Sequence, residues 1–137
     1  MSEIKAGTAI REITPSKSVF LVGYPHVDRW STGAHDPLLV SALAIKNDST
    51  TILMAAVDLL FVNPWTARGW RQAVADKLNI PQQNVFISCS HTHSSPHTCE
   101  VLEWGPSPVV PLVDPNYLEF VQLHQRSAAA RTPGSLD

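Results

Sequence analysis

The sequence predicts an α/β domain in which helices flank a mixed or parallel sheet. Two apolar, β-type runs joined by a polar turn come first, a helix with clear end signals follows, and a short β-rich run comes after the helix. The order strand, helix, strand is typical of a βαβ unit. With 137 residues, of which 44% are hydrophobic and 16% charged, the chain is large enough to bury one core.

Three runs in the first half of the chain are the predicted strands. Residues 6–14 alternate small or apolar side chains with polar ones and end before Pro15, as a half-buried strand would. Residues 38–46 and 50–62 are more uniformly apolar, and Asn47-Asp48-Ser49 between them favours a turn. We therefore expect these two runs to form a hairpin or to lie as neighbouring strands.

A helix is expected directly after these strands. Asn63 is a good N-cap and Pro64 a good first helical residue, and Ile80-Pro81 ends the periodic pattern. The expected apolar stripe consists of Trp65, Trp70, Val74 and Leu78. Residues 84–88 form the β-rich run that follows. The polar loop of residues 89–96 then lies at the carboxyl end of a strand, where open α/β sheets bind ligands.

The last third of the chain begins with a proline-rich segment, residues 104–115, which predicts an irregular covering loop. Asp114-Pro115 then starts a second helix, with Tyr117, Leu118 and Val121 on one side. Residues 124–137 lose apolar periodicity and are expected to form an irregular or disordered tail. The predicted domain therefore spans residues 1–123.

The charge pattern argues against nucleic acid as a partner. The formal net charge is −2, and the Lys and Arg residues are scattered without a basic run. No uninterrupted apolar stretch approaches the roughly 20 residues of a transmembrane helix. No signal-peptide core follows Met1, and two cysteines do not make a disulfide framework. We expect a cytoplasmic protein that acts on a small molecule.

The polar loop after residues 84–88 contains His91-Thr92-His93-Ser94. In extended backbone, His91 and His93 would point to the same side and could converge on one ion. Neutral imidazole is a common zinc ligand, and a zinc ion so held lowers the pKa of its bound water to about 7. The spacing alone is equally compatible with two solvated histidines.

Several neighbours have two open interpretations. His35 faces the same site or hydrogen-bonds within its own loop, and Asp58 orients a histidine or satisfies loop backbone. Ser94 adds a hydroxyl beside the histidines. Cys89 is either a nucleophile with a histidine as base or, as we favour, the end of a buried strand, while Cys99 is expected to be exposed.

Taken together, these segments resemble the N-terminal domain of the neutral/alkaline (non-lysosomal) ceramidase family. The matching pieces are Ala6-Gly7-Thr8-Ala9, Ile13-Thr14-Pro15, Val22-Gly23-Tyr24, Thr32-Gly33-Ala34-His35-Asp36-Pro37-Leu38, Ala56-Val57-Asp58-Leu59-Leu60, Asn84-Val85-Phe86-Ile87-Ser88 and His91-Thr92-His93-Ser94-Ser95-Pro96. They occur in the family's order over roughly residues 5–123 and end on its T-H-T-H-S-G-P type signature.

The resemblance implies a hydrolase that uses a single Zn²⁺ to cleave the amide of an N-acyl sphingoid lipid. His91 corresponds to the zinc-ligating histidine of the signature, and His93 to its catalytic neighbour facing substrate or the activated water. The implied reaction is attack of zinc-activated water on the amide carbonyl. A small-molecule or lipid amide is the expected partner, and oligomerisation is left open.

The sequence departs from the family at several points. Ser90 replaces a threonine, and Ser95 and His97 stand where glycines are common. The family takes a second histidine, a glutamate and a tyrosine for zinc from later in a longer chain, so the resemblance covers a partial domain. Two alternatives therefore remain: a catalytically silent metal-binding or interaction module, and a stand-alone hydrolase using His35, His91, His93 and Asp58.

Overall fold

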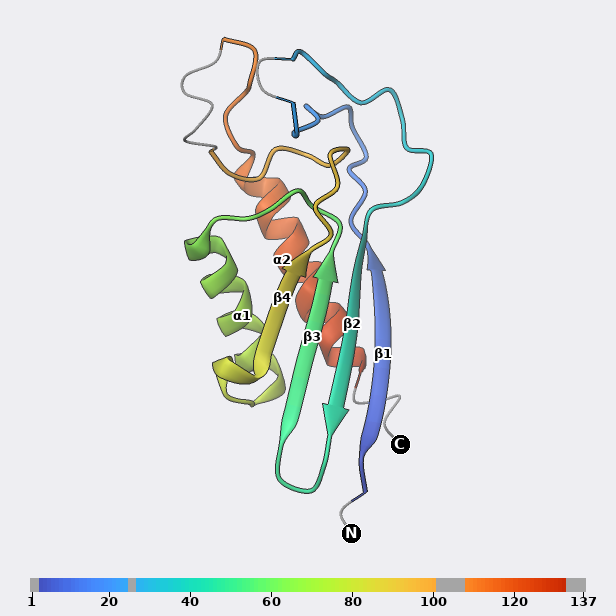
Figure 1. Cartoon of the computed structure of the whole chain (residues 1–137), viewed down its shortest axis with the longest axis vertical. Helices are drawn as coiled ribbons and strands as arrows, with labels where there is room; N and C mark the ends of the chain where they lie inside the picture. The colour runs from blue at the N-terminus through green and yellow to red at the C-terminus, as the bar shows by residue number, and fades with distance from the viewer. Residues whose placement is uncertain (1–2, 25–26, 101–107, 133–137) are drawn as a thin grey trace.

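The computed structural model describes residues 3–24, 27–100 and 108–132, and Figure 1 shows their arrangement. Within these ranges one mixed sheet has the strand order β1-β2-β3-β4. The strands are β1 (Lys5–Glu12), β2 (Leu39–Lys46), β3 (Thr51–Val57) and β4 (Val85–Cys89). The helices are α1 (Pro64–Leu78), the short 3-10 helix η1 (Gln82–Asn84) and α2 (Pro115–Arg131). The predicted α/β class with a mixed sheet is confirmed.

Strands β2 and β3 form the expected hairpin. They pair antiparallel from Lys46↔Thr51 to Val40↔Val57, and β1 pairs antiparallel with the other edge of β2. The Asn47 side chain closes the turn because its Oδ1 accepts from the backbone N–H groups of Ser49, at 3.1 Å, and Thr50, at 2.8 Å. This side-chain mimic of a backbone turn is what an asparagine at the start of a turn provides.

Helix α1 connects β3 to β4, which are parallel, so the predicted βαβ unit is confirmed. The Asn63 side chain accepts from the Thr66 N–H at 2.8 Å, and Pro64 is the first helical residue. Asn79 ends the helix in the left-handed conformation, with φ 53°. These are the local signals from which the helix was predicted.

The expected apolar stripe of α1 was wrong at Trp65. This side chain is 74% exposed, whereas Trp70 is 3% exposed and joins the core. Five residues correspond to a rotation of about 140° beyond one full turn, so Trp65 and Trp70 cannot face the same layer. Val74, four residues after Trp70, lies on the buried side instead.

The core lies between one face of the sheet and both helices. Helix α2 packs on β1 and β2, α1 packs on β4, and the two helices contact each other (Figure 1). The buried set from both layers is Val40, Ala42, Ala44, Leu53, Val57, Val85, Trp70, Val74, Ala75, Val121, Ala128 and Ala129. Along β2 and β3 the buried residues alternate with more exposed ones, as the period of a strand requires.

The expectation of an irregular tail from residue 124 was wrong, because α2 continues to Arg131. Gln125, Ala128 and Ala129 are buried at helical spacing, and alanine is both a strong helix former and small enough for close packing on the sheet. Residues 133–137 lie outside the described ranges, as do residues 101–107 of the predicted covering loop. Among the described residues, no helix is long and apolar enough to cross a membrane.

Candidate functional site

The histidine segment leaves the carboxyl end of β4 and remains attached to the chain that leaves β3. The Ser90 N–H donates to the Val57 carbonyl and the His91 N–H to the Leu59 carbonyl, each at 3.0 Å. His91 has φ 61°, so the expectation of extended backbone at this residue was wrong. A left-handed conformation is uncommon for any residue with a Cβ, and surrounding contacts must hold it in place.

The His91 ring is fixed through one of its two nitrogens. Its Nδ1 lies 3.0 Å from the Leu60 carbonyl oxygen, which can only accept a hydrogen bond. In the neutral imidazole Nδ1 therefore donates, and Nε2 carries the free lone pair. Histidines that bind metals are typically oriented in this way by a hydrogen bond from their second nitrogen. The His91 side chain is also exposed, so Nε2 is accessible.

The structure brings His93 next to His91, as expected. Their ring centroids are 5.2 Å apart, with an angle of 81° between the ring planes. His93 is half-buried, and its Nδ1 is enclosed without a hydrogen-bond partner among the described residues. A buried polar nitrogen of this kind costs free energy unless a ligand or solvent satisfies it. The pair therefore places two imidazole rings next to each other at the end of β4.

Gly23 and Tyr24 enclose the His93 ring from a distant part of the sequence. The Tyr24 ring centroid lies 5.4 Å from that of His93, at an angle of 67°. A Cβ at Gly23 would lie only 2.6–2.8 Å from three atoms of the His93 side chain, and the φ of Gly23 is +128°. Both the space and the backbone conformation therefore require glycine here.

Polar groups after the histidines hydrogen-bond this segment to the chain that follows β3 and to Val22. Ser95 is fully buried, its Oγ accepts from the Leu60 N–H at 3.1 Å, and its carbonyl accepts from the Val22 N–H at 3.1 Å. Thr98 Oγ1 donates to the Phe61 carbonyl at 2.6 Å. Ser95 stands where glycine is common in the family that the sequence resembles, and its hydroxyl supplies a hydrogen bond that glycine could not.

Of the remaining titratable groups in this segment, His97 and Cys99 are buried, Cys89 is half-buried and Glu100 is exposed. His97 is 6% exposed, and burial lowers its pKa, with a smaller opposing effect from Glu100. Burial raises the pKa of the Cys89 thiol and, together with Cys89 and Glu100, raises that of Cys99 to about 11. Cys99 is buried, so its expected exposure was wrong. Thiols with raised pKa values are poor nucleophiles at neutral pH, which agrees with a structural role for Cys89.

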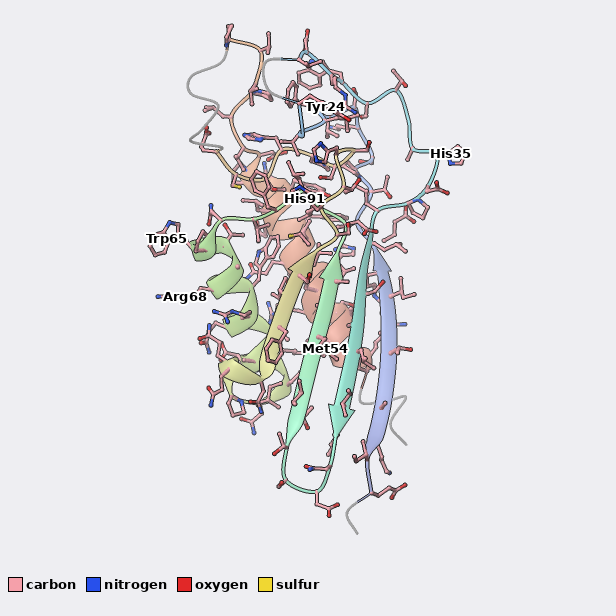
Figure 2. The ribbon with its side chains drawn as sticks, in the orientation of Figure 1. Tyr24, His35, Met54, Trp65, Arg68 and His91 are labelled. Atoms are coloured by element: carbon pink, nitrogen blue, oxygen red, sulfur yellow. The ribbon has the colours of Figure 1, made fainter. Side chains whose placement is uncertain are left out.

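His35 and Asp58 make contacts within the fold rather than with the histidine pair. The His35 side chain is 97% exposed, and its Nδ1 lies 2.8 Å from an Asp36 carboxylate oxygen. Asp58 Oδ2 accepts from the Leu39 N–H at 2.9 Å, and the Asp58 N–H donates to the Leu39 carbonyl. Figure 2 shows His35 projecting away from the region of His91 and Tyr24. Of the two alternatives for each residue, the structure supports the local one.

A cavity of about 900 Å³ lies on the other side of the histidine segment. Thr92 and Ser94 line it together with residues 14–19, residues 31–38 and Asp58, while His91 and His93 are not part of the lining. Ser94 therefore lines a cavity that adjoins the histidine segment, and the rings of His91 and His93 lie outside its lining. The volume is within the usual range for a small-molecule site.

The two imidazoles fit a zinc ion only in part. Within the described residues, no group of three or more His, Cys, Asp or Glu side chains is arranged to hold a metal ion. The fixed tautomer of His91 suits a metal, because it leaves the Nε2 lone pair as a donor, whereas the Nδ1 of His93 is enclosed beside Gly23. Catalytic zinc sites usually have three protein ligands, so these residues would form part of such a set.

The fold is similar to that of neutral ceramidase. The crystal structure of neutral ceramidase from Pseudomonas aeruginosa matches the whole of this chain with a TM-score of 0.75 and 18% sequence identity, over 22% of its own length. A structure of ceramidase complexed with C2 matches with the same values. The chain therefore spans about a fifth of the solved structures that it resembles. A scan against protein families and a search of curated proteins find no match.

Proposed function

We propose that this chain contributes part of the active site of a zinc-dependent hydrolase of N-acyl amides, of the ceramidase type. The observation that carries the proposal is the geometry of His91. A hydrogen bond to the Leu60 carbonyl fixes its ring, the residue is exposed, and the His93 ring lies 5.2 Å away. The fold similarity to neutral ceramidase supports the same assignment independently of this geometry.

In this proposal His91 Nε2 is a ligand of a single zinc ion. When bound, zinc supplies an activated water and a positive charge beside the amide carbonyl. His93 faces the same space and is the candidate for proton transfer or substrate contact, since its Nδ1 has no partner among the described residues. Further ligands come from outside this pair.

The substrate class rests on the fold similarity alone, because the solved neighbours are ceramidases by name. We propose an amide of a fatty acid, with the acyl chain as the apolar part. The cavity lined by Thr92 and Ser94 gives this side of the segment space for a polar group of the substrate.

A metal-binding module without catalysis is the second candidate. It is favoured by the donor count, because His91 and His93 supply two imidazoles where a catalytic zinc site usually has three protein ligands. Such a module would bind zinc and leave an amide intact. The two candidates therefore differ in turnover, not in the first binding step.

The test is zinc titration of the purified chain, followed by turnover of a fluorogenic long-chain N-acyl amide. The variant is His91→Asn, because asparagine tolerates the left-handed conformation of His91 and removes the imidazole. His35→Asn is the matched control for zinc binding, since His35 is exposed and its Nδ1 lies beside Asp36 in its own loop.

We expect the wild type and His35→Asn to bind one zinc ion per chain and His91→Asn to bind it at least about tenfold more weakly. Zinc binding with amide turnover supports the hydrolase, and zinc binding without turnover supports the metal-binding module. Absence of zinc binding in the wild type, or equal affinity in His91→Asn, would refute the proposed metal role of His91.

A further inference from the structure

Residues 19–24 and residues 27–31 run side by side next to the histidine segment. The Leu21 N–H donates to the Arg29 carbonyl at 2.8 Å, and the Ser31 N–H donates to the Val19 carbonyl at 2.9 Å. These two bonds place Arg29 opposite Leu21, and Leu21 forms an isolated β-bridge with Pro96. Arg29 is thereby brought close to the histidines, although it lies more than sixty positions away in the sequence.

Arg29 contacts His93 directly and also packs on Tyr24, which itself contacts His93. Its Nη1 donates to the His93 carbonyl at 3.1 Å, and its Cζ lies 4.6 Å from the centroid of the Tyr24 ring. Tyr24 in turn meets the His93 ring edge-on at 5.4 Å. The guanidinium is thus fixed both by a carbonyl and by an aromatic face, an arrangement that suits its planar charge.

We propose that Tyr24 and Arg29 are positioning residues that hold the His93 imidazole in one orientation, facing His91. The Gly23 backbone, the Tyr24 ring and the His91 ring surround the His93 side chain, so few of its rotamers are free of clashes. Arg29 fixes the His93 backbone and the Tyr24 ring relative to each other, because its guanidinium contacts both at the same time.

This inference rests on the proposed function, because that function is the reason why the His93 ring needs a fixed orientation. A catalytic or ligating imidazole is effective only when its direction is set before the ligand arrives. Within the described ranges the Nδ1 of His93 has no hydrogen-bond partner that would orient the ring, so packing contacts have to do so. The orientation itself is a property of the chain without metal.

The experiment is NMR spectroscopy of the histidine rings in the metal-free chain, with the His93 signals assigned through His93→Gln. The variants are Tyr24→Leu, which removes the ring, and Arg29→Met, which keeps an unbranched side chain and removes the guanidinium. Tyr24→Phe retains the ring as the conservative variant. Trp30→Leu is the matched control, because Trp30 is an exposed aromatic residue next to Arg29 that meets Phe20 edge-on.

We expect Tyr24→Leu to move the His93 ring signals, through loss of the Tyr24 ring current, and to give averaged χ1 couplings for His93. Arg29→Met should also give averaged couplings, whereas Tyr24→Phe and Trp30→Leu should keep a single rotamer. The His35 signals and the amide signals of β2 and β3 report that the fold is intact. Unchanged His93 couplings in both Tyr24→Leu and Arg29→Met, or equal averaging in Trp30→Leu, would overturn the proposal.

Zinc titration of the same variants separates this inference from the proposed function. With positioning, zinc affinity stays unchanged in both Tyr24→Leu and Trp30→Leu, because His91 and not His93 is the proposed ligand, whereas only Tyr24→Leu averages the His93 couplings. If the wild type binds no zinc while the His93 couplings still respond to Tyr24→Leu, the metal proposal fails and the positioning contact stands. If zinc binds normally in all variants and the couplings do not respond, the positioning role fails.

Discussion

Gly23→Ala provides the most direct test of how tightly the chain encloses His93. Two separate penalties apply at this position. The residue has a φ of +128°, which side chains with a Cβ rarely adopt, and the new Cβ would lie 2.6–2.8 Å from Nδ1, Cγ and Cβ of His93. The His93 ring cannot give way easily, because Tyr24 and His91 pack against it.

The expected loss can be estimated from these two penalties. The left-handed backbone costs a residue with a Cβ about 1–2 kcal/mol. Overpacking against a fixed ring adds about 1–3 kcal/mol. Lower entropy of the unfolded chain offsets about 0.4–1 kcal/mol of this sum. We therefore expect Gly23→Ala to lower the free energy of unfolding by about 1–5 kcal/mol, with a central value of about 3 kcal/mol, a large fraction of the stability of a typical domain.

Gly33→Ala is the matched control, because Gly33 also has a positive φ, +140°, but a Cβ there meets nothing within 4 Å. The backbone strain and the unfolded-state effect are shared, so the difference between the two variants isolates the contact with His93. Urea unfolding curves with equal slopes give both free energies. If the two variants lose the same stability to within about 0.5 kcal/mol, the contact with the His93 ring does not contribute to the loss. The tight enclosure of His93 by Gly23 is then refuted.

Three further predictions concern the segment after the histidines. Ser95→Ala should lower the free energy of unfolding by about 1–3 kcal/mol, measured by urea unfolding, because the buried Leu60 N–H loses its acceptor; a neutral effect would contradict this role. Cys99, with its pKa raised to about 11, should not react with a thiol reagent at pH 7.5 until the chain is unfolded. His97 has a folded pKa below its unfolded value, so the unfolded chain binds the proton first and stability should fall as pH drops below about 6.5. Unfolding at pH 7.5 and 5.5 tests this, and His97→Phe should reduce the difference.

The fold could be predicted where local chemistry decides the structure. The cap formed by Asn63 and Pro64 and the turn at Asn47 depend on residues a few positions apart, and both agree with the structure. The end of α2 could not be predicted in this way. Ala128 and Ala129 give little apolar periodicity, and their helical state depends on packing against the sheet. The expected burial of Trp65 was wrong because a spacing of five residues places Trp65 and Trp70 on different faces of α1.

The candidate site was predictable in its chemistry but not in its geometry. The motif His91-Thr92-His93 identified the two imidazoles, and the βαβ order placed them at the carboxyl end of a strand. The contacts of Tyr24 and Arg29 with His93 are long-range, and no spacing in the sequence reveals them. The glycine before Tyr24 is the one signal that could have found this enclosure, because glycine in a non-turn context often marks a close approach.

The positive φ of His91 explains why sequence rules fail at this point of the chain. An extended residue here would have continued β4, whereas the observed conformation turns the backbone N–H toward the Leu59 carbonyl and Nδ1 toward the Leu60 carbonyl. Two hydrogen bonds thus offset a backbone strain of about 1–2 kcal/mol. Departures from local preference that are held by specific contacts are typical of functional sites. The strain at His91 therefore supports the assignment of this residue, rather than His35 or Asp58, as the candidate ligand.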